Sequence, residues 1–162
     1  MTVRRGYAET ALGQIHYTEA GPSQAPAVLC LHQTPRSVDE FAELLPALAA
    51  RGLRGLAMDT LGFGASAAPR EHSIEAYAEG VVALLDELGQ ARVTLVGHHT
   101  GGVIAIEVAA AAPDRVERLV LTSTPYTDEQ FRERRRHHRG IDAVDVRDDG
   151  AHLVELLSLI HI

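Results

Sequence analysis

The residues best suited to chemistry stand in one short turn, Gly97-His98-His99-Thr100-Gly101. A mostly apolar run, residues 93–96, precedes it and a mostly apolar stretch through residue 112 follows, so the turn joins a strand to a helix. Glycine at both ends has a steric reason: strand and helix pass so closely that side chains there would collide. The central residue is pushed towards positive φ and lifted above the sheet. We therefore expect His99 to present its imidazole there.

An imidazole in this place can act in two ways. Neutral imidazole is a nucleophile near neutral pH, and unlike a hydroxyl it needs no neighbouring base to remove a proton first. It can equally act as a general base that activates water. The amino end of the following helix disfavours the imidazolium form and stabilises a developing oxyanion nearby. Both effects favour acyl transfer with His99 as the catalytic residue.

A second register of the same turn centres it on Thr100, as His98-His99-Thr100-Gly101-Gly102, and offers a hydroxyl nucleophile. That register puts a bulky imidazole at a crowded flank and a β-branched residue at positive φ. Both placements are unfavourable, so the register centred on His99 is preferred.

Strands alternate with helices in the region that must position the turn. This order predicts an α/β fold with a mostly parallel sheet, right-handed crossovers and helices on both faces. A helix that is apolar on every side, such as the one after the turn, is expected to be buried. The predicted strands are residues 28–31, 54–58, 93–96 and 116–122, after a hairpin of 7–10 and 14–18; the predicted helices are 38–48 behind Ser37, 74–88 behind Ser73, and 101–112.

Composition narrows the class of protein. The 162 residues include 15 Lys plus Arg and 22 Asp plus Glu, a formal charge of −7 that argues against a nucleic-acid partner. No apolar run is long enough for a bilayer, so a cytoplasmic protein without a membrane partner is predicted. Cys30 stands alone in an apolar run and is expected to be a buried small hydrophobe. There is no glycine-rich phosphate loop, so no organic cofactor is expected.

Three motifs, each at a strand end, resemble the α/β-hydrolase fold superfamily, in its branch of epoxide hydrolases, haloalkane dehalogenases, C–C bond hydrolases and small esterases. They are His32-Gln33-Thr34-Pro35, residues 59–66 and the His99 turn, within a likeness that covers residues 7–125. The resemblance implies an oxyanion hole made by the backbone N–H groups of Thr34 and Thr100, and a cis Thr34–Pro35 peptide bond.

Two departures from the family pattern affect the chemistry. The family carries Ser, Asp or Cys at the centre of the turn, where this chain has His99, and glycine where this chain has Gln33. The Gln33 side-chain amide is a further donor for the oxyanion or substrate. Asp59 is expected to hold its loop through backbone hydrogen bonds and not to catalyse.

Other titratable residues have plainer interpretations. The family pattern accounts for His32 and His98 as structural residues, which outweighs a zinc site made by these two and His99. No metal is therefore predicted. Asp128 or Glu129 is a candidate acid for the imidazole, although residues 127–129 fit better as the exposed cap of a following helix.

The domain prediction is residues 1–125 as the N-terminal part of a hydrolase core, truncated after the sixth strand, and residues 126–162 as the start of an incomplete cap. Within it, the basic residues of 132–139 fit a solvated helix face. Residues 157–162 look like sequencing-adapter read-through, which indicates an incomplete reading frame. Such a fragment is expected to have poor activity and marginal solubility.

The predicted function is hydrolysis of a small apolar ester, lactone or related carbonyl compound by His99, with that substrate and water as its partners. Two other classes stay open. One is a ligand-binding relative that does not hydrolyse, and the other is a lyase or cofactor-free oxygenase in which His99 removes a proton from the substrate.

Overall fold

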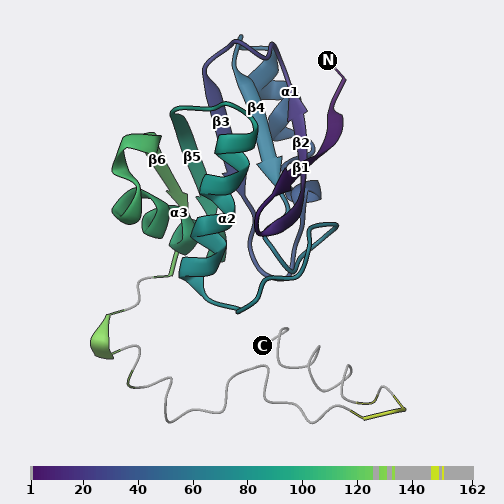
Figure 1. The fold of residues 1–162 in the computed structure, drawn as a ribbon, viewed down its shortest axis with the longest axis vertical. Coiled ribbons are helices and arrows are strands. Elements are labelled where there is room, and N and C mark those ends of the chain that lie inside the picture. The colour runs from purple at the N-terminus through teal and green to yellow at the C-terminus, as the bar shows by residue number, and fades with distance from the viewer. Residues whose placement is uncertain (1, 126–127, 131–132, 134–146, 150, 152–162) are drawn as a thin grey trace. The chain divides into compact units, whose positions relative to one another are not determined.

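The computed structural model describes residues 2–125, 128–130, 133, 147–149 and 151 (Figure 1). The chain divides into two compact units, Met1–Pro125 and Tyr126–Ile162. Most of residues 126–162 lie outside the described residues. This range contains the predicted basic helix, the predicted cap and the adapter-like end. The first unit contains the sheet and the His99 turn, and the description below concerns that unit.

Six strands form one sheet in the order β1-β2-β4-β3-β5-β6. The first two make the predicted hairpin, and β2 pairs antiparallel with β4. From β4 to β6 every pairing is parallel, which confirms the mostly parallel sheet. The strands are β1 (Arg4–Thr10), β2 (Gly13–Ala20), β3 (Ala27–Leu31), β4 (Arg54–Met58), β5 (Val93–His98) and β6 (Val116–Thr122).

Helices cover both faces of this sheet, as predicted. Helices α2 (Ile74–Glu87) and α3 (Thr100–Ala111) lie side by side on one face, while α1 (Leu44–Ala49) packs behind β4 and β2 (Figure 1). Two short 3₁₀ helices, η1 (Val38–Phe41) and η2 (Pro113–Arg115), complete the set. The Ser73 hydroxyl accepts a hydrogen bond from the Ala76 N–H, so α2 begins at the predicted cap.

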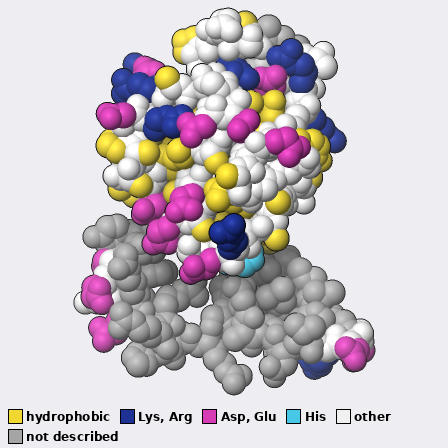
Figure 2. Space-filling view, viewed as in Figure 1, with side chains coloured by type: hydrophobic (Ala, Val, Ile, Leu, Met, Phe, Trp, Pro, Cys, Tyr) yellow, Lys and Arg dark blue, Asp and Glu magenta, His cyan; other side chains and the backbone are white. Residues whose placement is uncertain are grey.

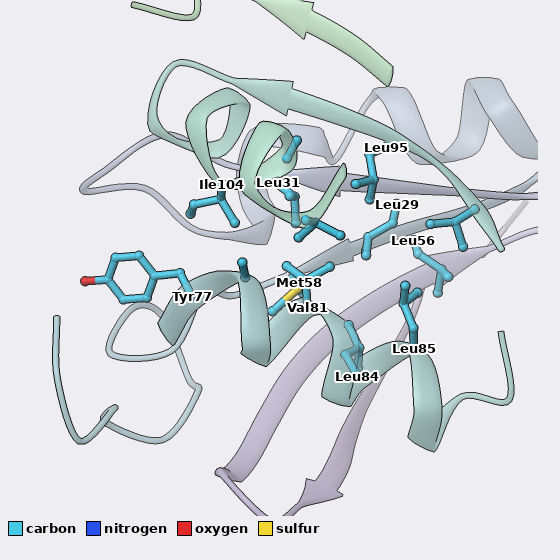
Figure 3. Packing of buried hydrophobic residues seen from close by; sticks show 14 of the residues in the cluster. Leu29, Leu31, Leu56, Met58, Tyr77, Val81, Leu84, Leu85, Leu95 and Ile104 are labelled. Carbon is cyan, nitrogen blue, oxygen red and sulfur yellow. The ribbon is translucent and has the colours of Figure 1, made fainter. Parts of the chain in front are cut away.

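The continuous apolar run of β3 follows from this layered arrangement. On β3, Leu29 and Leu31 face α2 and α3, whereas Val28 and Cys30 face η1 and α1. Successive side chains of a strand point to opposite faces, so a strand covered on both sides must be apolar throughout. Figure 3 shows the larger of the two cores, where Leu85 of α2 meets the side chains of the central strands.

Two expectations about helices were wrong. The single helix predicted over 38–48 is η1 followed by α1, because a continuous helix would place Pro46 in its interior, where it lacks an N–H and clashes with the preceding turn. In α1 that proline lies in the first turn, where no such bond is needed. Helix α3 is not buried all round: Ile104 faces the core, but Ile106 is 43% exposed, because the described elements that α3 contacts leave the side of Ile106 uncovered.

Strand β6 lies at one edge of the sheet, and among the described residues no strand pairs with its outer side. Leu119, Val120 and Leu121 are 37%, 44% and 42% exposed. The unit therefore presents apolar side chains at this edge. None of the described helices is long and apolar enough to cross a bilayer.

Cys30 offers a test of the packing behind β3. The thiol is free and fully buried, and this burial raises its pKa to about 12 from 9.0. Thiolate is the reactive form, so at about pH 8 we expect Ellman's reagent to modify native Cys30 at least tenfold more slowly than the urea-unfolded chain. Above pH 9 the unfolded thiol loses a proton that the native thiol retains, so the free energy of unfolding should decrease as pH rises. Equal modification rates would contradict this packing.

Candidate active site

His99 is the whole connection between β5, which ends at His98, and α3, which begins at Thr100. Its φ is 50° and its ψ −114°, which confirms the positive φ that the flanking glycines predict. The His99 N–H donates to the Thr122 carbonyl at 3.0 Å, and its own carbonyl accepts from the Gly102 N–H at 3.0 Å. The residue is exposed, and its Nδ1 lies 3.3 Å from the Thr100 hydroxyl oxygen. The imidazole is therefore exposed at the top of the turn, beside the Thr100 hydroxyl.

The glycines of the turn have the predicted steric role. A Cβ on Gly97 would come within 2.5 Å of the Gly101 carbonyl oxygen and of the Gly102 Cα. A Cβ on Gly101 would collide with the Leu31 carbonyl and lie 2.8 Å from that of His32. Backbone cannot yield to such a contact, so the turn packs directly on the end of β3. The register centred on Thr100 is wrong, because Thr100 is already the first residue of α3.

The end of β3 leads into the segment that carries the other predicted donor. Thr34 is exposed, and its peptide bond to Pro35 is cis, as the family resemblance implies. In the part of the chain that the structure describes, neither the Thr34 N–H nor the Thr100 N–H donates to another atom. The first residues of a helix have no intrahelical acceptor, which explains the Thr100 amide. Two amides at the carboxyl ends of the strands thus have no acceptor among the described residues.

Gln33 is half-buried, and its backbone N–H makes a long contact of 3.4 Å with a Glu40 carboxylate oxygen. Its side-chain amide makes no hydrogen bond with any described residue, so the amide remains free to contact a ligand. The Gln33 side-chain amide, the predicted third donor, therefore lies next to Thr34 in the chain and makes no hydrogen bond that holds the described fold together.

His32 and His98 are held by the fold. His32 is 1% exposed: its Nε2 accepts from the Thr60 N–H at 3.0 Å, and its Nδ1 lies 2.8 Å from the Gln33 carbonyl. His98 Nδ1 lies 2.9 Å from the Thr122 hydroxyl of β6. Both ring nitrogens of His32 are therefore occupied, which leaves none for a metal. No group of three His, Cys, Asp or Glu side chains among the described residues could hold an ion.

Asp59 holds three segments together, a wider role than the loop contact predicted for it. One carboxylate oxygen accepts from the Val38 N–H at 2.7 Å; the other accepts from the Ala65 N–H at 2.9 Å and lies 2.8 Å from His16 Nδ1. The carboxylate is buried, so these donors replace its hydration. His16 could not be identified from the sequence, because only the pairing of Tyr17 of β2 with the end of β4 places it beside Asp59.

Asp128 and Glu129 belong to the second unit. Glu129 is helical and Asp128 directly precedes it, while residue 127 lies outside the described residues, so the capping interpretation stays a prediction. Participation of Asp128 as an acid stays a prediction.

Two surface grooves, of about 590 and 490 Å³, lie over α2. Their lining includes Leu12, Glu75 and Glu79, and Figure 2 shows acidic side chains gathered on this face with apolar atoms between them. Neither groove includes His99 or Thr34. The candidate site is therefore defined by the exposed His99 imidazole and by the Thr34 and Thr100 amides. It does not coincide with either groove.

The architecture is that of an α/β hydrolase. It combines a mostly parallel sheet, helices on both faces and a sharp strand-to-helix turn whose central residue has positive φ. The family model described as "alpha/beta hydrolase fold" matches residues 26–144. The chain belongs to this family.

Individual relatives cover the same region. The chain is 35% identical over 116 residues to bifunctional epoxide hydrolase 2 of Sus scrofa, which is 70% of this chain and 20% of the relative. It resembles the structure of an epoxide hydrolase from an endophytic Streptomyces (TM-score 0.72, 35% identity, 77% of this chain and 38% of that one). It also resembles the enol-lactonase from Burkholderia xenovorans LB400 (TM-score 0.66, 31% identity, 70% and 45%). The chain thus spans less than half the length of each.

Proposed function

We propose that this chain is the N-terminal part of a hydrolase that acts on a small apolar ester, lactone or related carbonyl compound, with His99 as the reactive group. The observation that carries the proposal is the exposed His99 imidazole at φ 50°, on a turn whose neighbouring Thr100 amide is free. The named activities of the relatives support hydrolysis as the class of reaction, and the likeness to an enol-lactonase supports a lactone or enol ester among the substrates.

Each residue has a defined task in this reaction. The unprotonated nitrogen of neutral His99 attacks the carbonyl carbon, and the electron pair of the C=O bond moves to the oxygen. The N–H groups of Thr34 and Thr100 donate to that oxygen as it becomes negative. One such donor contributes about 10²- to 10³-fold in rate. Collapse of the intermediate expels the alcohol, which takes the proton from the other ring nitrogen. Water then cleaves the acyl-imidazole to the acid and restores neutral His99.

General-base catalysis uses the same groups without the covalent step. His99 would take a proton from water while the resulting hydroxide attacks the carbonyl, and the two amides would stabilise the same oxyanion. Collapse of that intermediate breaks the bond to the alcohol, which takes the proton back from His99. The two routes differ in one observable, because only nucleophilic attack leaves an acyl group on residue 99.

The test is hydrolysis of p-nitrophenyl esters and simple enol lactones by the whole protein of which this chain is proposed to be the N-terminal part, and by its His99→Ser variant. We expect the unsubstituted protein to release nitrophenol faster than an equal concentration of free imidazole, and His99→Ser to be slower, because serine needs a base to lose its proton. Mass spectrometry of acid-quenched samples distinguishes an acylated His99 from base catalysis. A faster His99→Ser variant would assign the natural role to ligand binding, since a downstream acid and base pair would then exist without its nucleophile. Rates equal to free imidazole would refute hydrolysis.

A further inference from the structure

The surroundings of the His32 ring determine which of its nitrogens carries the proton. Its Nδ1 lies 2.8 Å from the Gln33 carbonyl oxygen, and its Nε2 lies 3.0 Å from the Thr60 backbone nitrogen. A carbonyl oxygen can only accept a hydrogen bond, and a backbone N–H can only donate one. Both contacts are satisfied only by a neutral ring that carries its proton on Nδ1. His32 therefore donates to Gln33 and accepts from Thr60.

The Gln33 carbonyl is held by two donors at once. Besides the His32 ring, the Arg36 N–H donates to the same oxygen at 2.8 Å, so both of its lone pairs are engaged. The peptide bond from Gln33 to Thr34 is trans, and in a trans peptide the C=O and N–H bonds point in opposite directions in one plane. Holding the carbonyl therefore directs the Thr34 N–H away from His32, to the side where it has no acceptor among the described residues.

We propose that His32 is a positioning residue that sets the direction of the Thr34 N–H by holding the Gln33 carbonyl. The orientation of the amide stands on these contacts alone. Its consequence for catalysis rests on the proposed function, in which that amide binds the oxyanion.

The ring is well placed to act as a fixed support. It is 1% exposed, and the Phe63 ring meets it edge-on, with centroids 6.0 Å apart and planes at 72°. The Thr60 N–H that holds Nε2 comes from the residue after Asp59, just beyond the end of β4. His32 thus links the segment after β3 to the segment after β4, and a movement of either would reorient the amide.

Two shape-matched variants separate this role from simple packing. In His32→Asn, the side-chain NH₂ can occupy the place of Nδ1 and still donate to Gln33. In His32→Gln, the side-chain oxygen can occupy the place of Nε2 and still accept from Thr60, while the donor to Gln33 is lost. Each variant loses one hydrogen bond of the ring, so similar losses of stability are expected from both.

The main readout is the Thr34 amide in ¹H–¹⁵N correlation spectra. We expect its cross-peak to keep its position in His32→Asn and to move in His32→Gln. Where ester hydrolysis is measurable, kcat should fall about 10²- to 10³-fold in His32→Gln, as on loss of one oxyanion donor, and far less in His32→Asn. Equal displacement of the Thr34 cross-peak in the two variants would assign His32 a packing role only and overturn the proposal.

The unsubstituted protein gives a second test that needs no variant to fold. The ¹⁵N shifts of the His32 ring should be those of the neutral Nδ1–H tautomer, with a scalar coupling from Nδ1 across the hydrogen bond to the Gln33 carbonyl carbon. An Nε2–H tautomer, an imidazolium ring or absence of that coupling would overturn the proposal. Absence of ester hydrolysis in the unsubstituted protein would refute the proposed function and leave these spectra to decide the role of His32.

Discussion

Replacing His99 by alanine is expected to lower kcat/KM for p-nitrophenyl ester hydrolysis by about 10²- to 10⁴-fold, the range of a lost general base or nucleophile. The reason is geometric. His99 is the residue at positive φ between β5 and α3, and its imidazole is exposed beside the Thr100 amide. The amides of the site remain in the variant, so the rate that persists measures their contribution without the imidazole.

The neighbouring imidazole is the control for this substitution. His98→Ala removes the same chemical group one residue earlier, where the ring contacts the Thr122 hydroxyl on β6. We expect kcat/KM of that variant to change little, because its ring is turned to the sheet edge. Unchanged activity in His99→Ala would remove His99 from the mechanism, and an equal loss in both variants would assign the effect to disruption of the turn.

Replacing Asp59 by alanine should lower the free energy of unfolding by about 3–5 kcal/mol, the cost of removing one partner from a buried charged network. The substitution leaves the Val38 and Ala65 N–H groups and the His16 ring without their acceptor in a buried site. Buried donors that lose their acceptor retain the full cost of desolvation. Urea unfolding followed by circular dichroism measures the change.

Two further variants show whether burial is the cause. Asp86→Ala removes an ion pair between Asp86, whose side chain is 63% exposed, and Arg115. Such surface pairs contribute at most about 1 kcal/mol. Asp59→Asn keeps the shape but replaces one acceptor oxygen by a donor, so its loss should lie between the two. A cost for Asp59→Ala no larger than that of Asp86→Ala would show that the three donors find other acceptors.

Short-range patterns predicted the strands and the His99 turn well. Strand β4 has the predicted bounds, Arg54–Met58, and after Arg54, which is paired with Glu19, the strand holds no polar side chain, as burial on both faces requires. The turn was identifiable because Gly97 and Gly101 mark positions where a Cβ would meet backbone atoms. Patterns failed where the outcome depends on a distant neighbour: the exposure of Ile106 depends on which elements cover α3.

The amino-acid order thus sufficed for the alternation of strands and helices and for the residue at the head of the turn, because adjacent residues decide both through steric fit and apolar periodicity. The contacts of Asp59 with His16 and of His32 with Gln33 and Thr60 came only from the folded chain. A hydrogen bond requires a donor and an acceptor about 3 Å apart and correctly oriented. Strand register and ring orientation set the distance and direction of these contacts, and local sequence does not encode either.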